Sequence, residues 1–360
     1  MRNRLERVRE RLKERGHSAF IVSRPVNVRY LSGFSGAHGA LYIDLNGAFL
    51  LSDFRYAEQA AAESPDFSFV LVKEKLFDAV AGLARERASG EGGYPLEVAV
   101  EDDYLSHRDF GYLGEKMACA LHPADGLVEK MRLVKDEGEI ESLARACALA
   151  DEALAEVLPH IRAGVTENAV AARLEFVMRL KGSEGASFET IAASGPHSAM
   201  PHARASDRLL QAGDLLTLDF GAVCRGYHSD ITRTFVLGEP SPEQDRIYRL
   251  VGEAQSLGVE AVRPGIAVKD LDALVRDKIT AAGHGEHFGH SLGHGVGLEV
   301  HEGPRLSGKD ETVLAPGMVV TVEPGVYVPG FGGVRIEDSV LVTADGHRVL
   351  TGSPKIFVLH

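Results

Sequence analysis

The chain has 360 residues, of which 44% are hydrophobic and 25% are charged, a composition typical of a soluble globular protein that can bury a sizeable core. Its length predicts two domains rather than one. The formal net charge of −13 argues against nucleic acid as a partner, because nucleic acid phosphates require a basic protein face.

The N-terminal segment "MRNRLERVRERLKERG" is charged throughout and lacks the apolar core of a secretory signal. No stretch of the sequence approaches the roughly 18 consecutive apolar residues that span a membrane. The three cysteines, Cys119, Cys147 and Cys224, are scattered along the chain and predict reduced, buried thiols. We therefore expect a cytoplasmic protein with no membrane partner.

The first part of the chain has the pattern of an α/β domain. Leu5, Val8 and Leu12 recur at helical spacing within residues 2–15, and Gly16 can end that helix. The other expected elements, in chain order, are a strand at 19–24, a Gly-rich turn at 32–40, a strand at 40–44, a loop at 87–95 and a strand at 96–101.

The pattern breaks around "HPADG", 122–126, and a long helix is expected from near Lys135 to about Leu158. We place the domain boundary at this break, which divides the chain into residues 1–128 and 129–360. The second part contains the more informative pattern, an internal repeat.

The repeat begins with a turn and a helix. Residues 161–174 resemble residues 262–275 at an offset of 101, with Gly164 matching Gly265. Both segments predict a turn followed by an amphipathic helix. They are the first sign that the second domain is built from two similar halves.

The same repeat continues into two acid-bearing strands. The segment "AGDLLTLDFG" resembles "PGMVVTVEPG" at an offset of 104, and Asp219 in the first matches Glu323 in the second. A little further on, Asp230 pairs with Glu337 of "GVRIEDSVLVT". Two halves that each deliver two carboxylates predict a pseudo-symmetric α+β domain with one shared site.

Strand geometry brings these acids to one side of the predicted sheet. Side chains alternate faces along a strand, so the polar residues share a face in the pairs Thr217 with Asp219, Thr321 with Glu323, and Arg335 with Glu337. Four carboxylates on one surface repel one another unless they are protonated or neutralised. Salt bridges to Arg225, Arg233 or Arg335 would neutralise one or two of them, whereas a pair of divalent metal ions would neutralise all four.

Histidines occur in two segments near these acids. His290, His294 and His301 lie in "FGHSLGHGVGLEVHEGP", which we expect to be a Gly-rich loop whose glycines let the backbone approach a ligand closely. The segment "SGPHSAMPHARASD" adds His197 and His202 before the first acidic strand. Three histidines in one Gly-rich segment between acid-bearing elements indicate a functional site, whereas the second segment is only weakly informative by itself.

Together these residues resemble a known family. The motifs "LDFG…SDITRT", "GHSLGHGVGLEVHE", "VEPG" and "GGVRIED" are similar to those of the "pita-bread" metallopeptidases, which include methionine aminopeptidase, prolidase and aminopeptidase P, plus the metal-free creatinase. An additional N-terminal domain resembles the prolidase and aminopeptidase P branch. The resemblance covers essentially the whole chain. It implies an α/β N-terminal domain followed by an α+β pita-bread (creatinase/aminopeptidase-like) catalytic domain with an internal pseudo-twofold repeat.

The resemblance also implies a dinuclear metal site. Asp219 would bind one metal ion, His294 and Glu323 would bind the other, and Asp230 and Glu337 would bridge the two. A ligand set rich in oxygen donors suits Mn²⁺, with Co²⁺, Fe²⁺ and Zn²⁺ left open. A hydroxide that bridges the two ions would attack the peptide carbonyl.

Further roles follow from the same resemblance. Glu323 would accept a proton, His301 would stabilise the oxyanion and His202 would position the substrate or leaving group. His290 would line the substrate pocket, and Arg335, as well as Thr232, would orient the metal ligands. His38 would reach the active site of the other subunit in a homodimer. His197 matches no histidine of the family's motifs, so we expect it to be a surface loop residue.

The implied function is an exopeptidase that hydrolyses the Xaa-Pro bond at the N-terminus of proline-containing peptides. The motif "YLSGFSGAHG" favours an aminopeptidase P, which accepts longer peptides. Arg305 favours the alternative, an Xaa-Pro dipeptidase (prolidase), because a guanidinium group can bind the C-terminal carboxylate of a dipeptide. A remote alternative is a relative that binds peptides without catalysis.

Overall fold

The computed structural model describes residues 2–88 and 97–359, and it divides into two compact units, Met1–Arg132 and Leu133–His360. The expected boundary after residue 128 stays a prediction. In the described ranges, none of the helices is both long enough and apolar enough to cross a membrane.

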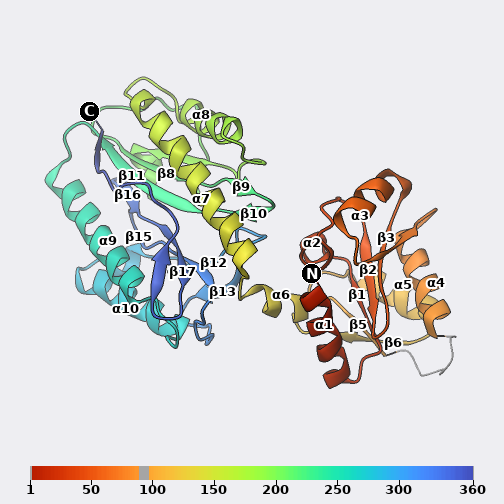
Figure 1. The fold of residues 1–360 in the computed structure, drawn as a ribbon. Coiled ribbons are helices and arrows are strands. Elements are labelled where there is room, and N and C mark those ends of the chain that lie inside the picture. The colour runs from red at the N-terminus through yellow and green to blue at the C-terminus, as the bar shows by residue number, and fades with distance from the viewer. Residues whose placement is uncertain (1, 89–96, 360) are drawn as a thin grey trace. The chain divides into compact units, whose positions relative to one another are not determined.

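The N-terminal unit is built around one six-stranded mixed sheet with the strand order β4-β3-β2-β1-β5-β6. Helices α4 and α5 cover one face of this sheet, whereas α1 and α2 lie on the other (Figure 1). The bounds are α1 Arg2–Arg15, β1 Ala19–Val22, α2 Pro25–Ser32, β2 Ala40–Asp44, β3 Ala48–Ser52, the 3₁₀ turn η1 Phe54–Tyr56, α3 Ala57–Glu63, β4 Ser68–Leu71, α4 Leu76–Ala88, β5 Glu97–Val100, α5 His107–Met117, β6 Ala120–Pro123 and α6 Leu127–Arg132.

Most elements expected here from the sequence are present. The helix over residues 2–15 is confirmed and ends at Gly16, whose φ of 71° suits glycine. The strands β1, β2 and β5 are also confirmed, although most of the loop expected at 87–95 and the first residue of the strand expected at 96–101 lie outside the described residues.

Helix α2 was not expected from the sequence. Its first turn is stabilised from a distance, because the Glu101 carboxylate accepts backbone N–H groups from Ser23 and Arg24 at 2.6 and 2.7 Å. A carboxylate at a helix N-terminus satisfies donors that have no partner within the helix. A partner more than 70 residues away leaves no local signal in the sequence.

The second unit contains two larger sheets, with strand orders β19-β11-β8-β7 and β13-β12-β14-β17-β18, and two small hairpin sheets. Helices α7 and α8 pack on the first sheet, and α9 and α10 lie on the opposite side of the unit, where they share a core with the second sheet (Figure 1). The bounds are α7 Glu137–Val157, η2 Leu158–His160, α8 Glu167–Leu180, β7 Ile191–Ser194, η3 Gly195–Ala199, β8 Leu215–Phe220, β9 Val223–Cys224, β10 Tyr227–His228, β11 Ile231–Leu237, α9 Pro242–Ala261, α10 Val268–Ala281, η4 Gly285–His287, β12 Gly293–Gly295, β13 Glu302–Leu306, β14 Val319–Val322, β15 Gly325–Val328, β16 Gly332–Arg335, β17 Asp338–Val342, β18 His347–Val349 and β19 Val358–Leu359.

The internal repeat of the sequence is visible in this unit. Gly164 and Gly265 both have a φ of 87°, and each lies in the turn before a 14-residue helix, α8 or α10. Strands β8 and β14 occupy equivalent places. Strand β8 pairs antiparallel with β11, which follows Asp230, and β14 pairs antiparallel with β17, which follows Glu337. The long helix expected from near Lys135 is present as α7.

Three expectations about the strands were wrong. The segment "GVRIEDSVLVT" is split between β16 and β17 in different sheets, so that Glu337 lies between strands rather than within one. Asp230 directly precedes β11 and Glu323 directly follows β14, so only Asp219 projects from inside a strand. His294, expected in a loop, lies in the short strand β12.

The cysteines are unpaired, as expected. Cys147 is buried, whereas Cys119 and Cys224 are only partly buried, which differs from the expectation.

Candidate active site

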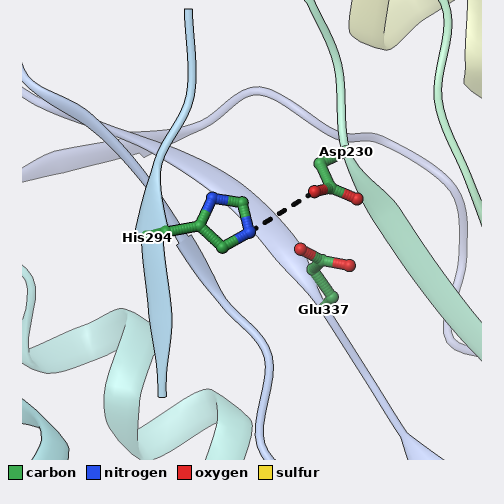
Figure 2. Close-up of side chains that lie close together, drawn as sticks. All are labelled: Asp230, His294 and Glu337. Carbon is green, nitrogen blue, oxygen red and sulfur yellow. Dashed lines mark ion pairs between the residues drawn. The ribbon is translucent and has the colours of Figure 1, made fainter. Parts of the chain in front are cut away.

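Five side chains from both halves of the second unit converge at its centre. They are the four acids and the histidine that the sequence singled out: Asp219, Asp230, His294, Glu323 and Glu337. Figure 2 shows Asp230, His294 and Glu337 with their polar ends facing one another from three different segments. One ligand atom from each of these three lies within 4.8 Å of the others.

The backbone carbonyl of the next residue, Gly295, orients the imidazole of His294. Its Nδ1 lies 3.1 Å from the Gly295 carbonyl oxygen, so Nδ1 carries the hydrogen and donates it there. The other nitrogen, Nε2, then faces the acids, 3.3 Å from Glu323 Oε1 and 3.6 Å from Asp230 Oδ2. This is the arrangement in which a histidine can offer Nε2 to a metal ion.

Three buried carboxylate oxygens have no hydrogen-bond partner among the described residues: Asp219 Oδ1, Asp230 Oδ1 and Glu337 Oε1. Burying an ionised carboxylate without a partner is costly, by several kcal/mol or more on the order-of-magnitude scale. Oxygen atoms of this kind, grouped around one imidazole nitrogen, are suitable ligands for hard or borderline divalent cations. The residues present therefore fit a divalent metal centre.

The electrostatics of the acids support this fit. Burial, followed by repulsion from Glu337, Asp219 and Glu323, raises the pKa of Asp230 well above its ordinary value. Burial and the same kind of repulsion raise the pKa of Glu337. Burial also raises the pKa of Asp219, although the nearby charge of Arg335 opposes the shift. Without cations, these carboxyl groups retain protons that a metal ion would displace.

Glu323 behaves differently from the other acids. Burial would raise its pKa, but the hydrogen bond and charge of His294, with the charges of His290 and Arg335, outweigh burial and lower the pKa to about 2. The pKa of His294 is raised in turn. Burial alone would lower it, but the hydrogen bond and the negative charge of Glu323 outweigh the effect of burial. Glu323 is therefore the acid that stays ionised most readily.

We predict that divalent cations stabilise the metal-free protein more at about pH 8 than at about pH 5.5. Because the folded-state pKa values of Asp230 and Glu337 are raised, the folded protein holds protons that the unfolded chain releases. The free energy of unfolding then falls as the pH rises from about 4 through those folded-state values. Cations that replace these protons would restore the free energy of unfolding that is lost as the pH rises.

The measurement is thermal unfolding of chelator-treated protein with and without about 1 mM Mn²⁺ at both pH values. We expect Tm to rise by about 5–10 °C near pH 8, and by less near pH 5.5. NaCl at the same ionic strength is the control. Equal shifts at both pH values would contradict the role given to these two carboxyl groups.

Arg335 and Thr232 connect two of the acids. Arg335 Nη2 lies 2.5 Å from Asp219 Oδ2, and its Nε donates to the Thr232 hydroxyl at 3.1 Å. That hydroxyl donates in turn to Glu337 Oε2 at 2.7 Å. Arg335 thus contacts Asp219 directly and reaches Glu337 only through Thr232.

The acids lie in a cavity of about 750 Å³ that the other histidines also line. His202, His290 and His301 all border it, and the ring centroids of His301 and His294 are 4.2 Å apart. Burial lowers the pKa of His290, and its Nδ1 donates to the Ser291 carbonyl at 2.8 Å. The structure therefore brings all three histidines to the same cavity as the acids.

Arg305 also lines this cavity, and no carboxylate of the described residues pairs with its guanidinium group. Its backbone N–H donates to Asp310, which fixes the start of the side chain. An unpaired guanidinium group beside a cluster of acids is available to bind an anionic group of a ligand.

His38 and His197 lie elsewhere. His38 belongs to the N-terminal unit, where its side chain is exposed and its carbonyl accepts a hydrogen bond from Ser52, and its contact with a second subunit stays a prediction. His197, expected as a surface residue, is only half-exposed. Its Nδ1 lies 3.2 Å from the fully buried Glu167.

Sequence reasoning missed several residues of the site. Tyr327 accepts a hydrogen bond from Arg335 Nη1 at 2.7 Å, and its hydroxyl lies 3.0 Å from His290 Nε2. No local pattern pointed to Tyr327, because its strand β15 belongs to a different sheet from β14, the strand that Glu323 follows. Glu302, which follows His301 in the chain, forms a nearly buried ion pair with Lys135 at 2.9 Å, and no local pattern predicts that pairing.

Comparison with known proteins agrees with this geometry. Residues 141–344 match the family model "Metallopeptidase family M24", and residues 4–134 match "Creatinase/Prolidase N-terminal domain". The chain belongs to metallopeptidase family M24. It is an enzyme, a metal-dependent peptidase with the pita-bread fold, rather than the non-catalytic relative that was the remote alternative.

The similar proteins include a curated relative and two solved structures. The chain is 41% identical to an Xaa-Pro dipeptidase of Pyrococcus furiosus over 355 residues, with 98% of each protein covered. It is 43% identical to the structure titled Xaa-Pro dipeptidase from Bacillus anthracis, with a TM-score of 0.95 and 99% of each chain covered. A structure titled X-Pro aminopeptidase from Thermotoga maritima is 39% identical, with a TM-score of 0.88. The match covers 95% of this chain and 98% of that structure's chain.

Proposed function

We propose that this M24 peptidase is an Xaa-Pro dipeptidase and that residues 129–360 carry its catalysis. The observation that carries the proposal is the unpaired Arg305 guanidinium group in the same cavity as the acids, where it can bind the C-terminal carboxylate of a dipeptide. Relatives named Xaa-Pro dipeptidase support this alternative better than our first expectation, an aminopeptidase P.

The five converging side chains would hold two divalent ions: Asp219 at one, His294 and Glu323 at the other, with Asp230 and Glu337 shared. Oxygen-rich ligands favour Mn²⁺, and Co²⁺, Fe²⁺ and Zn²⁺ are the alternatives. Bound ions of this kind polarise a peptide carbonyl and make water a stronger acid.

The protein's own groups would then handle protons and position the substrate. Glu323 would accept a proton from the attacking water at a carboxylate oxygen, the role that the family resemblance implies. His301 would donate a hydrogen bond to the carbonyl oxygen as it gains charge, and His202 would hold the substrate. Tyr327, which is itself held by Arg335, would fix His290 beside the substrate.

The walls of the cavity fit the rest of a dipeptide. Phe188, Ile191 and Pro201 offer apolar surface to a proline ring, whereas Arg305 would bind the carboxylate beside that ring. Proline has no amide hydrogen and restricts its neighbours, so a dedicated pocket is an advantage for this bond. Proline-containing peptides are thus the proposed substrates, whereas the cytoplasmic location and the homodimer stay predictions.

The deciding experiment compares three substrates in the presence of Mn²⁺: Ala-Pro, its C-terminal amide and Ala-Pro-Ala. We expect kcat/KM to be about 10- to 100-fold higher for Ala-Pro than for the other two, because only its carboxylate can pair with Arg305. Arg305→Met should remove this difference mainly by raising KM for Ala-Pro.

Arg348→Met, which removes an exposed arginine from β18, is the matched control and should leave all three rates unchanged. Efficient cleavage of Ala-Pro-Ala at the Ala-Pro bond would favour an aminopeptidase P, the activity named for the Thermotoga maritima relative. Cleavage of none of the three by metal-loaded protein would reject Xaa-Pro specificity.

A further inference from the structure

A single buried hydroxyl group joins two of the proposed metal ligands. Thr321 lies on β14, two residues before Glu323, and is fully buried. Its Oγ1 accepts the backbone N–H of His294 at 3.1 Å and donates to Glu323 Oε1 at 3.2 Å. One side chain therefore fixes the backbone that carries the histidine and also one oxygen of the neighbouring acid.

This arrangement restricts Glu323 before any ion binds. Its Oε1 contacts both the Thr321 hydroxyl and His294 Nε2, at 3.2 and 3.3 Å. Thr321 is itself stiff, because a β-branched side chain has few χ1 states. Thr321 also has a rigid position, since β14 pairs with β17 and lies beside β12.

The equivalent residue of the other half is arranged differently. Thr217 lies two residues before Asp219, as Thr321 does before Glu323, but its hydroxyl contacts the Thr234 hydroxyl at 3.2 Å and the Gly333 carbonyl at 3.4 Å. Asp219 is instead oriented by Arg335. The repeat has thus kept a threonine in both halves, and only one of them contacts an acid of the site.

We propose that Thr321 is a positioning residue for metal binding, which holds His294 and Glu323 in one relative arrangement before a cation enters. The inference rests on the proposed function in that it takes both residues as metal ligands. Groups that hydrogen-bond to metal ligands typically affect metal affinity by about 10- to 100-fold. Loss of the hydroxyl group should weaken the binding of the metal ion held by His294 and Glu323. The binding of the ion held by Asp219 should be less affected.

The test is calorimetric titration of chelator-treated protein with Mn²⁺, which reads affinity without using activity. Thr321→Val keeps the shape and removes the hydroxyl, and we expect one of two Mn²⁺ equivalents to bind about 10- to 100-fold more weakly. Thr321→Ser keeps the hydroxyl and should bind within about threefold of the unaltered protein. Thr217→Val is the matched control from the repeat and should also stay within about threefold.

The outcomes separate this inference from the proposed function. If the unaltered protein binds no Mn²⁺, the metal centre itself is wrong. If it binds two equivalents and Thr321→Val binds them equally well, only the role of Thr321 is wrong. Should Thr321→Val fail to fold, Thr321→Ala provides the hydroxyl-free protein, and an affinity equal to that of Thr321→Ser would overturn the inference.

Discussion

Replacement of Glu337 by Gln should lower kcat/KM for an Xaa-Pro dipeptide by about 10³-fold or more, while the metal-free protein becomes no less stable. Glu337 Oε1 is buried without a partner, and its Oε2 accepts the Thr232 hydroxyl. Glutamine fills the same space and its amide oxygen can still accept that hydrogen bond. The change removes one of four carboxyl groups that repel one another when ionised and, with it, a proposed metal ligand.

The two effects are measured on the same preparations. Steady-state kinetics with Mn²⁺ should show the loss of activity, and thermal unfolding with a chelator should show an unchanged or higher Tm. The Tm gained on adding Mn²⁺ should become smaller than in the unaltered protein. Asp277→Asn, which removes an exposed acid from α10, controls for the change in net charge. Retention of activity above about one tenth would mean that Glu337 is not a ligand.

Replacement of Arg233 by Met should destabilise the second unit by about 3–5 kcal/mol, the usual range when one partner of a buried ion pair is removed. Arg233 is 1% exposed, and its guanidinium group pairs with Asp338 at 2.8 Å. It also donates to the carbonyl oxygens of Ser353 and Glu337. Burial raises the pKa of Asp338, but Arg233 and Lys355 outweigh burial and lower it. Of the cationic partners of Asp338 among the described residues, only the more exposed Lys355 would remain, beside hydrogen bonds from Gln255 and Thr351.

For a unit of this size the loss corresponds to a fall in Tm of about 6–20 °C. Activity should fall as well, even where the variant is folded, because Arg233 holds the backbone of Glu337. Thermal unfolding and kinetics at a temperature below the transition will separate these effects. Arg249→Met, at an exposed ion pair on α9, should shift Tm by no more than about 2 °C. A comparably small shift for Arg233→Met would show that the buried pair adds little.

The structure agrees with the sequence where the pattern is local. Apolar spacing predicted α1 and α7, and the repeat predicted equivalent turns at Gly164 and Gly265. The same repeat singled out the four acids before their positions were known. Patterns of this kind are readable because helix and strand periods act over a few neighbouring residues.

The expectations that failed depended on distant contacts. The helix α2 is capped by Glu101, and the acid segment at Glu337 breaks between two sheets whose strands come from other parts of the chain. The preference for an aminopeptidase P came from one short motif in the N-terminal unit, and the relatives support the alternative, an Xaa-Pro dipeptidase, better. We propose that peptide length depends on what lines the cavity beside the acids.

The sequence by itself determined the two-halved catalytic domain, the family resemblance and the residues that could hold metal ions, because residue type and spacing carry that information. Only the tertiary structure decided which carboxylate oxygens lack hydrogen-bond partners, that Arg335 pairs with Asp219 while Arg233 pairs with Asp338, and that no carboxylate of the described residues pairs with Arg305. The physical reason is that each such pairing joins residues that the chain brings together only on folding. Their energies depend on burial and on distances between side chains, which no local pattern specifies.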